Sequence, residues 1–319
     1  MSTEATPVAR GRIYRDVYAK RVDTDPVTAT ADLRRAELDA DGLHFVSVGD
    51  RAAALSDGVF LVRIPDGIPI PDGDAFASGF HRGPEHPPYG RFRDITAGRF
   101  GDPLLGFHQR VNQIEQFLLE RRFWPTDYPQ EIARLGERLT MLSRLILASV
   151  LDHVGVPTEE RHTATGGCSD GTGSYHLTFN HYRPTMSSVG LSSHKDDGFL
   201  TILRTTTPGL EVNRNNRWER VPVDPDHFVI NFGLSMELLT ARSGSPVAAI
   251  MHRVTQQGED RCSYGHFSSS NCLPGSDDGV YQWSPTEGLT RICGSRELID
   301  LNDYEIYAGT DVPEEEFDG

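Results

Sequence analysis

The stretch GLSSHKDDGFLTIL, which starts at Gly190, contains two residue types that bind metal ions well, His194 and Asp196. The surrounding residues predict a β-strand, and in a strand residues i and i+2 project from the same face. We therefore expect His194 and Asp196 to point together and Lys195 to point away. The same pair also fits a second interpretation, in which the histidine and the carboxylate only hydrogen-bond to each other.

A third candidate ligand lies in AAIMHRVTQQGEDRCSYGHF, where an apolar strand is followed by a polar turn and a second strand. Ile250 and Val254 would share the face of His252, so His252 is predicted to look into the apolar interior. Two histidines and one carboxylate form the facial triad of non-haem Fe(II) oxygenases, which leaves three adjacent coordination positions open. Those positions can take a bidentate 2-oxo acid and dioxygen.

The returning strand of this hairpin places Arg261 and Ser263 on one face. If that face is inward, the buried guanidinium needs an anionic partner, and no acidic residue alternates along the face. A bound carboxylate would supply the charge, because the planar guanidinium grips it through two hydrogen bonds and the serine hydroxyl adds a donor. The alternative is an edge strand with Arg261 in water.

Short segments separated by turn residues run from about Tyr175 to Phe267 and indicate a β-rich region. We predict strands in SYHLTFNHY, GFLTIL, LEV, RWERVPV, HFVINFG, MELLT, AAIMHRVTQ and RCSYGHF. Many short strands at even spacing favour a sandwich, a barrel or a jelly roll.

The residues before the β-rich region predict other elements. Helical spacing is expected from Gly106 to Gly155, with one long amphipathic helix that starts near Pro129 and stops at Gly155. Residues 58–74 predict a strand followed by a turn, and residues 76–101 a long ordered loop. A short helix is one expectation after Asp25–Pro26.

Several segments together resemble the 2-oxoglutarate/Fe(II)-dependent dioxygenase superfamily, in its isopenicillin-N-synthase-like branch. They are, in the order of the family, NHYRP, HKDDGFLTIL, GLEVNRNNRWERVPVDPDHFVINFG, HRV and RCS. LSDGVFLVRIPDGIPIPD and WPTDYPQEIARL are similar to the N-terminal strand and the helix start of that family. The resemblance covers about residues 50–270. It implies a mainly β fold with flanking helices, in which a double-stranded β-helix (jelly roll) core is supported by a long α-helix.

The resemblance also implies a set of site residues. The expected iron ligands are His194, Asp196 and His252, and the expected 2-oxoglutarate contacts are Arg261, Ser263, Tyr182 and Asn180. Dioxygen would be the second cosubstrate, and ascorbate is expected to stimulate turnover. The implied activity is hydroxylation, desaturation or cyclisation of a small molecule, in specialised-metabolite or antibiotic biosynthesis. A carboxylate at position 196 disfavours halogenation, for which the family replaces this residue by a small one.

Substrate contacts are expected from the mouth of the barrel. The candidates are Tyr89, Arg91, Arg93, Thr205 and the region of Trp283. Arg91 and Arg93 suit a carboxylate or phosphate, but each also suits a surface position or an internal ion pair. Thr205 stands where the branch often has glutamine.

The remaining histidines are not expected to bind iron. His181 and His266 stand at odd offsets from proposed site residues, so they should face away. The others are interpreted as structural or surface residues: His44, His81, His86, His108, His153, His162, His176 and His227.

The composition and charge of the chain exclude some classes of binding partner. The 319 residues carry 31 Lys and Arg against 46 Asp and Glu, a net charge of −15, and no basic run suits nucleic acid or an anionic membrane. No stretch of eighteen apolar residues or N-terminal leader pattern is present, and the four cysteines lack CxxC spacing. We expect a soluble cytoplasmic protein with reduced thiols that acts on a small molecule. Its oligomeric state is not predicted.

A single domain over residues 1–319 is expected, in four segments. These are an N-terminal arm (1–42), a part with the first strand, loops and helices (43–165), the jelly-roll core with the metal site (166–270), and a C-terminal segment with an acidic tail (271–319). Two alternative functions stay open. One is an iron-dependent oxidase of the same fold that does not use 2-oxoglutarate, and the other is a non-catalytic, cupin-like jelly roll that binds a metal or ligand.

Overall fold

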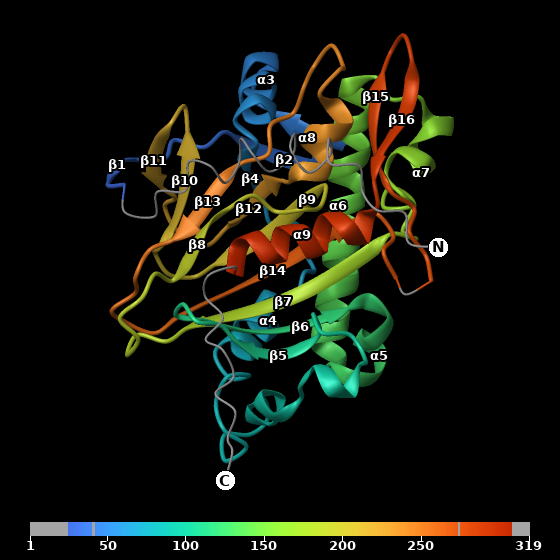
Figure 1. Ribbon diagram of the computed structural model, residues 1–319. Coiled ribbons are helices and arrows are strands. Elements are labelled where there is room, and N and C mark those ends of the chain that lie inside the picture. The colour runs from blue at the N-terminus through green and yellow to red at the C-terminus, as the bar shows by residue number, and fades with distance from the viewer. Residues whose placement is uncertain (1–24, 40–41, 274, 308–319) are drawn as a thin grey trace.

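Two β-sheets face each other across the interior that contains the predicted site residues (Figure 1). The computed structural model describes residues 25–39, 42–273 and 275–307, with side chains described up to Asn302. Most of the predicted N-terminal arm and the acidic end of the predicted C-terminal segment therefore lie outside the described residues.

The larger sheet has nine strands in the described part of the chain. Their order is β3 (Gly42–Phe45), β2 (Arg35–Asp39), β4 (Val59–Arg63), β12 (His227–Phe232), β9 (Leu200–Thr205), β14 (Arg261–Ser269), β7 (Ser174–Tyr182), β6 (Ile114–Glu120) and β5 (Gly106–Gln109). All neighbouring pairs are antiparallel except β2 and β4.

The smaller sheet lies over one end of the larger sheet. Its described strands follow the order β1 (Val27–Thr30), β11 (Arg217–Arg220), β10 (Leu210–Arg214), β13 (Met251–Val254) and β8 (Leu191–His194). One buried apolar cluster joins the two sheets, with Val59 and Val229 from the larger sheet and Val212 from the smaller one. This arrangement confirms the predicted double-stranded β-helix.

The long helix α6 (Gln130–Val154) supports the outer face of the larger sheet, as predicted. Its apolar residues, including Leu135, Leu139 and Ile146, are fully buried in the main core. The helix ends at Gly155, whose φ of 88° lies in the left-handed region that glycine adopts without steric cost. Figure 1 shows α6 behind the larger sheet and α9 (Ser295–Tyr307) crossing in front of it.

The remaining elements connect or cover these layers. The other helices are α3 (Val48–Asp57), α4 (Ile70–Ala77), α5 (Trp124–Asp127), α7 (Arg161–Ala164) and α8 (Leu234–Thr240). Short 3-10 turns are η1 (Gly90–Asp94), η2 (Ala97–Arg99), η3 (Arg121–Phe123) and η4 (Thr158–Glu160), and β15 (Val280–Ser284) pairs with β16 (Gly288–Cys293). In the described part of the chain, no helix has the length and apolar character needed to cross a membrane.

Three predictions of local structure were wrong. The region from Gly106 to Glu120 forms β5 and β6 rather than helix, because pairing of β6 with β7 overrides the helix propensity of EQFLLE. MELLT forms helix α8 rather than a strand, in keeping with the helix propensity of Met, Glu and Leu. The segment after Asp25–Pro26 forms β1, where VTAT supplies β-branched residues that pair with β11.

Two smaller differences concern residues 58–101. The predicted strand is β4, but the residues after it continue into helix α4 instead of ending in a turn. The predicted loop contains η1 and η2, which hold it against the main core through the fully buried Phe92.

Candidate metal and cosubstrate site

Three buried side chains converge between the two sheets. His194 ends β8, Asp196 follows two residues later, and His252 lies on β13, where it is the direct cross-strand partner of His194. Oδ1 of Asp196 lies 3.6 Å from Nε2 of His194 and 3.7 Å from Nε2 of His252. In the described part of the chain, this is the only group of three or more such residues whose ligand atoms could share one ion.

Backbone carbonyls orient both imidazole rings. Nδ1 of His194 donates to the carbonyl of Ser192 (2.8 Å), and Nδ1 of His252 donates to the carbonyl of Ile250 (3.3 Å). A proton on Nδ1 leaves the lone pair on Nε2, the atom that faces Asp196. Burial, followed by the neighbouring His194, lowers the pKa of His252 to about 4, so this ring is neutral at neutral pH.

The carboxylate of Asp196 is held in its ionised form. Burial alone would raise its pKa, but the two histidines and the hydroxyl of Thr201 outweigh burial and lower the pKa to about 2. Thr201 donates to Oδ2 of Asp196 (2.6 Å), which leaves Oδ1 toward the histidines. Lys195 points away, as its spacing predicts, and its Nζ pairs with Glu237 of α8.

The residues fit a divalent transition metal. Two imidazole nitrogens with fixed lone pairs and one ionised carboxylate oxygen converge in a buried place, which is the donor set of a facial triad. A metal would also supply the positive charge that the buried Asp196 carboxylate otherwise lacks. The sequence-predicted ligands are thus brought together, and their metal-binding role is a prediction that the geometry supports.

A buried arginine lies on the neighbouring strand β14. Arg261 is 2% exposed, and its Nε donates to the carbonyl of Pro208 (3.1 Å) while Nη1 lies 3.4 Å from Oγ of Ser263. Its guanidinium stacks over the ring of Tyr182 at 4.5 Å. Among the described residues no carboxylate forms an ion pair with Arg261, so the edge-strand alternative is excluded and a buried cation remains to be neutralised.

The triad and this arginine line the same cavity, which has a volume of about 130 Å³. Ser263 is the cross-strand partner of both Asn180 on β7 and Thr205 on β9, so the three side chains share the inward face. Tyr182, Asn180 and Thr205 all line the cavity, as the sequence predicted for a common site.

Other lining residues were missed by the sequence interpretation. They are Gln116 of β6, Asp197 beside the triad, Phe267 of β14 and Asn302 of α9. Gln116 was missed because its segment was interpreted as a helix. The inward orientation of its side chain follows only when the segment is recognised as a strand. Phe267 shares its face with Ser263 by even spacing, and this signal was available in the sequence.

The proposed substrate contacts do not all meet at the cavity. Tyr89 packs against Phe76, and its hydroxyl donates to Glu131; Arg93 donates to the carbonyl of His81. Arg91 is exposed. Trp283 packs in the main core. None of these four residues lines the cavity that holds the triad, so of the named candidates Thr205 alone lies there.

The two histidines at odd offsets face away, as predicted. His181 lies beside Glu115, with its Nδ1 2.8 Å from the carboxylate, and stacks on His81. His266 is buried against Trp124 and contacts Thr140 of α6. Both therefore belong to the outer face of the larger sheet.

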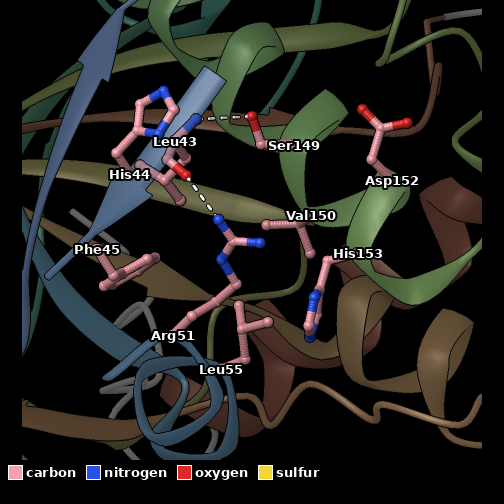
Figure 2. Close-up of a pocket in the computed structure, with 9 residues that line it drawn as sticks. All are labelled: Leu43, His44, Phe45, Arg51, Leu55, Ser149, Val150, Asp152 and His153. Atoms are coloured by element: carbon pink, nitrogen blue, oxygen red, sulfur yellow. Dashed lines mark hydrogen bonds between the residues drawn. The ribbon is translucent and has the colours of Figure 1, made fainter. Parts of the chain in front are cut away.

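A separate cavity of about 270 Å³ lies between β3, α3 and the end of α6 (Figure 2). Nη2 of Arg51 donates to the carbonyl of Leu43 (3.3 Å), and the backbone N–H of Leu43 donates to Oγ of Ser149 (3.0 Å). His44 and His153 also line it, but they belong to no group that could share a metal ion in the described part of the chain. The triad site is therefore the stronger functional candidate.

Comparisons with known proteins point to the same site. Residues 174–270, which include the triad and Arg261, match the model of the 2OG-Fe(II) oxygenase superfamily. The chain is similar to 2-oxoglutarate-dependent dioxygenase 21, chloroplastic, of Oryza sativa subsp. japonica, with 29% identity over 44% of this chain and 43% of that protein. It is also similar to jasmonate-induced oxygenase 2 of Arabidopsis thaliana, with 30% identity over 45% of this chain and 40% of that protein. The chain thus spans about two fifths of the length of these curated relatives.

A solved structure shares the fold over most of the chain. It is the crystal structure of JOX2 in complex with 2OG, Fe and JA, with a TM-score of 0.62 and 20% sequence identity. The match covers 88% of this chain and 94% of that one. At this level of identity the likeness concerns the fold.

Proposed function

The chain belongs to the 2OG-Fe(II) oxygenase superfamily, whose members use Fe(II) and 2-oxoglutarate, and on that premise we propose that it is a dioxygenase that oxidises a small molecule. One observation carries the proposal. A single buried cavity holds both the converged His194, Asp196 and His252 and an arginine, Arg261, that has no acidic partner among the described residues.

The proposal assigns a binding or orienting role to each of the site residues. His194, Asp196 and His252 would hold Fe(II), and Thr201 would keep Oδ1 of Asp196 aimed at it. Arg261 and Ser263 would bind the distal carboxylate of 2-oxoglutarate. When bound, the iron and 2-oxoglutarate would supply the oxidising chemistry. In it, 2-oxoglutarate and one oxygen atom of O2 become succinate and CO2, and the other oxygen atom is inserted into a substrate C–H bond in hydroxylation or leaves as water in desaturation and cyclisation.

The protein contributes position and exclusion of water. The metal ligands and Arg261 are nearly fully buried, and their partners fix each of them in one orientation. Burial keeps water from the reacting centre and strengthens the attraction between the Arg261 cation and a carboxylate. The iron and 2-oxoglutarate, rather than the protein side chains, would supply the chemistry that breaks the substrate C–H bond.

The finer features of the function are proposals as well. Hydroxylation, desaturation and cyclisation all fit the site, and ascorbate would keep the iron reduced. Another relative is named gibberellin 3-beta-dioxygenase 2-2, of Triticum aestivum, which supports a small-molecule substrate and a role in specialised metabolism, of which antibiotic biosynthesis is one form. The net charge of −15 supports the absence of nucleic-acid and anionic-membrane partners. The four free thiols support a reducing, cytoplasmic location.

The test uses the purified full chain without oxygen. Addition of Fe(II) and then 2-oxoglutarate should give a weak visible charge-transfer band, and admission of oxygen should release succinate. His194→Ala and His252→Ala should abolish both signals, whereas the exposed His86→Ala serves as the matched control and should keep both.

Three results would decide against the proposal. Absence of the visible band together with oxygen uptake would favour the oxidase that does not use 2-oxoglutarate. Unchanged turnover in metal-depleted buffer would show that the activity does not depend on a metal at the triad. No succinate under any condition would favour the non-catalytic jelly-roll alternative.

A further inference from the structure

The cavity between β3, α3 and the end of α6, which we call the α3–α6 cavity, contains an arginine without an anionic partner. Arg51 of α3 lines it, and Nη2 of Arg51 donates to the carbonyl of Leu43 (3.3 Å). Within the described residues, this carbonyl is the only hydrogen-bond acceptor of the guanidinium, and no carboxylate forms an ion pair with it. Nε and Nη1 are therefore available to the acceptor atoms of a ligand.

The nearby carboxylates have other partners. Asp50 precedes Arg51 in the sequence, but it lies 3.4 Å from Nε of Arg34. Asp152 of α6 lines the cavity, but it pairs with Arg161. The charge of the partly buried Arg51 is thus not neutralised within the described part of the chain, and a bound carboxylate would complete the pair.

A second polar group lies beside this cation. His153, in the last turn of α6, lines the cavity and has no hydrogen-bond partner among the described residues. Burial, followed by the positive charge of Arg51, lowers the pKa of His153, so the ring is neutral at neutral pH. A neutral imidazole carries one N–H donor, which can bind an oxygen of the same carboxylate without adding charge.

The rest of the lining is largely apolar. Phe45 of β3, Leu55 of α3 and Val150 of α6 contribute side chains, and Figure 2 shows the guanidinium of Arg51 in their midst. The cavity volume is about 270 Å³. A cavity of roughly 150 Å³ is enough to hold benzene, so a ring with one carboxylate fits.

The charges of the lining limit the ligand to one negative charge. His44 is exposed, and its Nε2 already lies 2.9 Å from the carboxylate of Asp39. Asp152 adds a negative charge to the lining and opposes a second carboxylate on the ligand. The lining therefore suits a monoanion with an apolar body.

We propose that the α3–α6 cavity binds a small monocarboxylic acid with an apolar ring, whose carboxylate lies between Arg51 and His153. The ring would pack against the apolar side chains of Phe45, Leu55 and Val150. Arg51 suits the role because a guanidinium binds a carboxylate through two parallel hydrogen bonds. The cavity shares no lining residue with the cavity of the triad, so this site is independent of the proposed oxygenase activity.

The experiment measures the binding of four probes to the purified full chain without added metal or 2-oxoglutarate. Benzoate, benzyl alcohol, benzylamine and terephthalate share an aromatic ring and differ in charge. Binding is followed by calorimetry and, independently, by the rise in melting temperature, because a ligand of the folded state stabilises it. We expect benzoate to bind roughly tenfold more tightly than benzyl alcohol, and benzylamine and terephthalate to bind more weakly than benzoate.

Variants of the lining separate direct contact from a structural effect. Arg51→Gln should weaken benzoate roughly tenfold and leave benzyl alcohol unchanged, so that the preference for the acid disappears. His153→Leu should weaken benzoate by a smaller factor, roughly threefold, because it removes a neutral donor. The exposed Arg91→Gln is the matched control and should keep the preference of the unaltered chain.

The buried Arg261 is a second place where benzoate could bind, so Arg261→Gln is measured as well. We expect this variant to keep the tight binding that Arg51→Gln loses. If Arg261→Gln loses it instead, benzoate binds in the cavity of the triad and the inference is overturned. Equal binding of benzoate and benzyl alcohol, or an equal loss of both in Arg51→Gln, would also overturn it. None of these results bears on the visible band and the succinate release that test the proposed function.

Discussion

Thr201 donates a 2.6 Å hydrogen bond to Oδ2 of Asp196, the carboxylate oxygen that does not face the two histidines. The two residues come from different parts of the β-helix, since Thr201 lies on β9 and Asp196 follows the end of β8. The contact restricts rotation of the carboxylate and keeps Oδ1 toward His194 and His252. Second-sphere contacts of this type orient metal ligands and raise metal affinity.

Replacement of Thr201 by valine removes this hydrogen bond and keeps the shape of the side chain. We expect the affinity of the metal-free protein for Fe(II) or Co(II) to fall roughly tenfold, because Asp196 then samples orientations that do not bind metal. A metal titration without oxygen measures the change. Thr163→Val, at an exposed position of α7, is the control and should bind metal normally. Equal affinity of Thr201→Val and the unaltered chain would show that the hydroxyl does not orient the ligand.

Arg261→Gln tests whether Arg261 binds the distal carboxylate of 2-oxoglutarate. Loss of two charge-assisted hydrogen bonds should raise the 2-oxoglutarate concentration for half-maximal succinate release by roughly 30-fold, with a smaller effect on the maximal rate. The metal affinity should change little, because Arg261 makes no contact with the triad in the described structure. The exposed Arg217→Gln provides the comparison. An unchanged 2-oxoglutarate requirement would mean that Arg261 neutralises some other group.

Sequence spacing predicted much of the site because strand periodicity is local. Even spacing placed Arg261 with Ser263, and Asn180 with Tyr182, on inward faces, and odd spacing turned His181 and His266 outward. The convergence of His252 with His194 was reached through the facial-triad pattern and the resemblance to a known family. Local spacing alone does not say which strands become neighbours.

The missed features depend on contacts between distant segments. EQFLLE has the composition of a helix, and its strand conformation is imposed by pairing with β7, so the inward position of Gln116 was hidden. Asn302 on α9 lines the cavity of the triad and donates to the carbonyl of Lys195, which is 107 residues away in the sequence. The sequence pattern within a helix does not indicate which surface of the protein the helix will cover.

Asn231 provides a test of stability. It is fully buried on β12 opposite Thr201, and neither end of its amide has a hydrogen-bond partner among the described residues. Asn231→Leu removes an unsatisfied polar group, so we expect the metal-free protein to gain about 1 kcal/mol in free energy of unfolding. Asn231→Asp should lose stability at neutral pH, because it buries a charge. Denaturant unfolding measures both changes. A clear loss of stability in Asn231→Leu would show that an internal water satisfies the amide or that the larger side chain does not fit.

The contact between Asp102 and Arg296 should make the attachment of α9 sensitive to acid. Burial alone would raise the pKa of Asp102, but hydrogen bonds from Arg296 and from the backbone N–H of Leu104 outweigh burial and lower it. A carboxyl whose folded-state pKa lies below its unfolded value of about 3.9 contributes stability above that value. The contribution is lost as pH falls from there through the lower folded-state pKa.

Asp102→Asn isolates this effect, because asparagine keeps an oxygen for Leu104 but cannot ionise. At pH 7 we expect the unaltered chain to be about 1 kcal/mol more stable than Asp102→Asn, and the difference should shrink as pH falls below about 4. Free energies of unfolding measured for both proteins between pH 7 and 3 give the comparison. Asp94→Asn, outside this contact, controls for the loss of one negative charge. A difference that is independent of pH would show that the ionised form of Asp102 does not hold α9 in place.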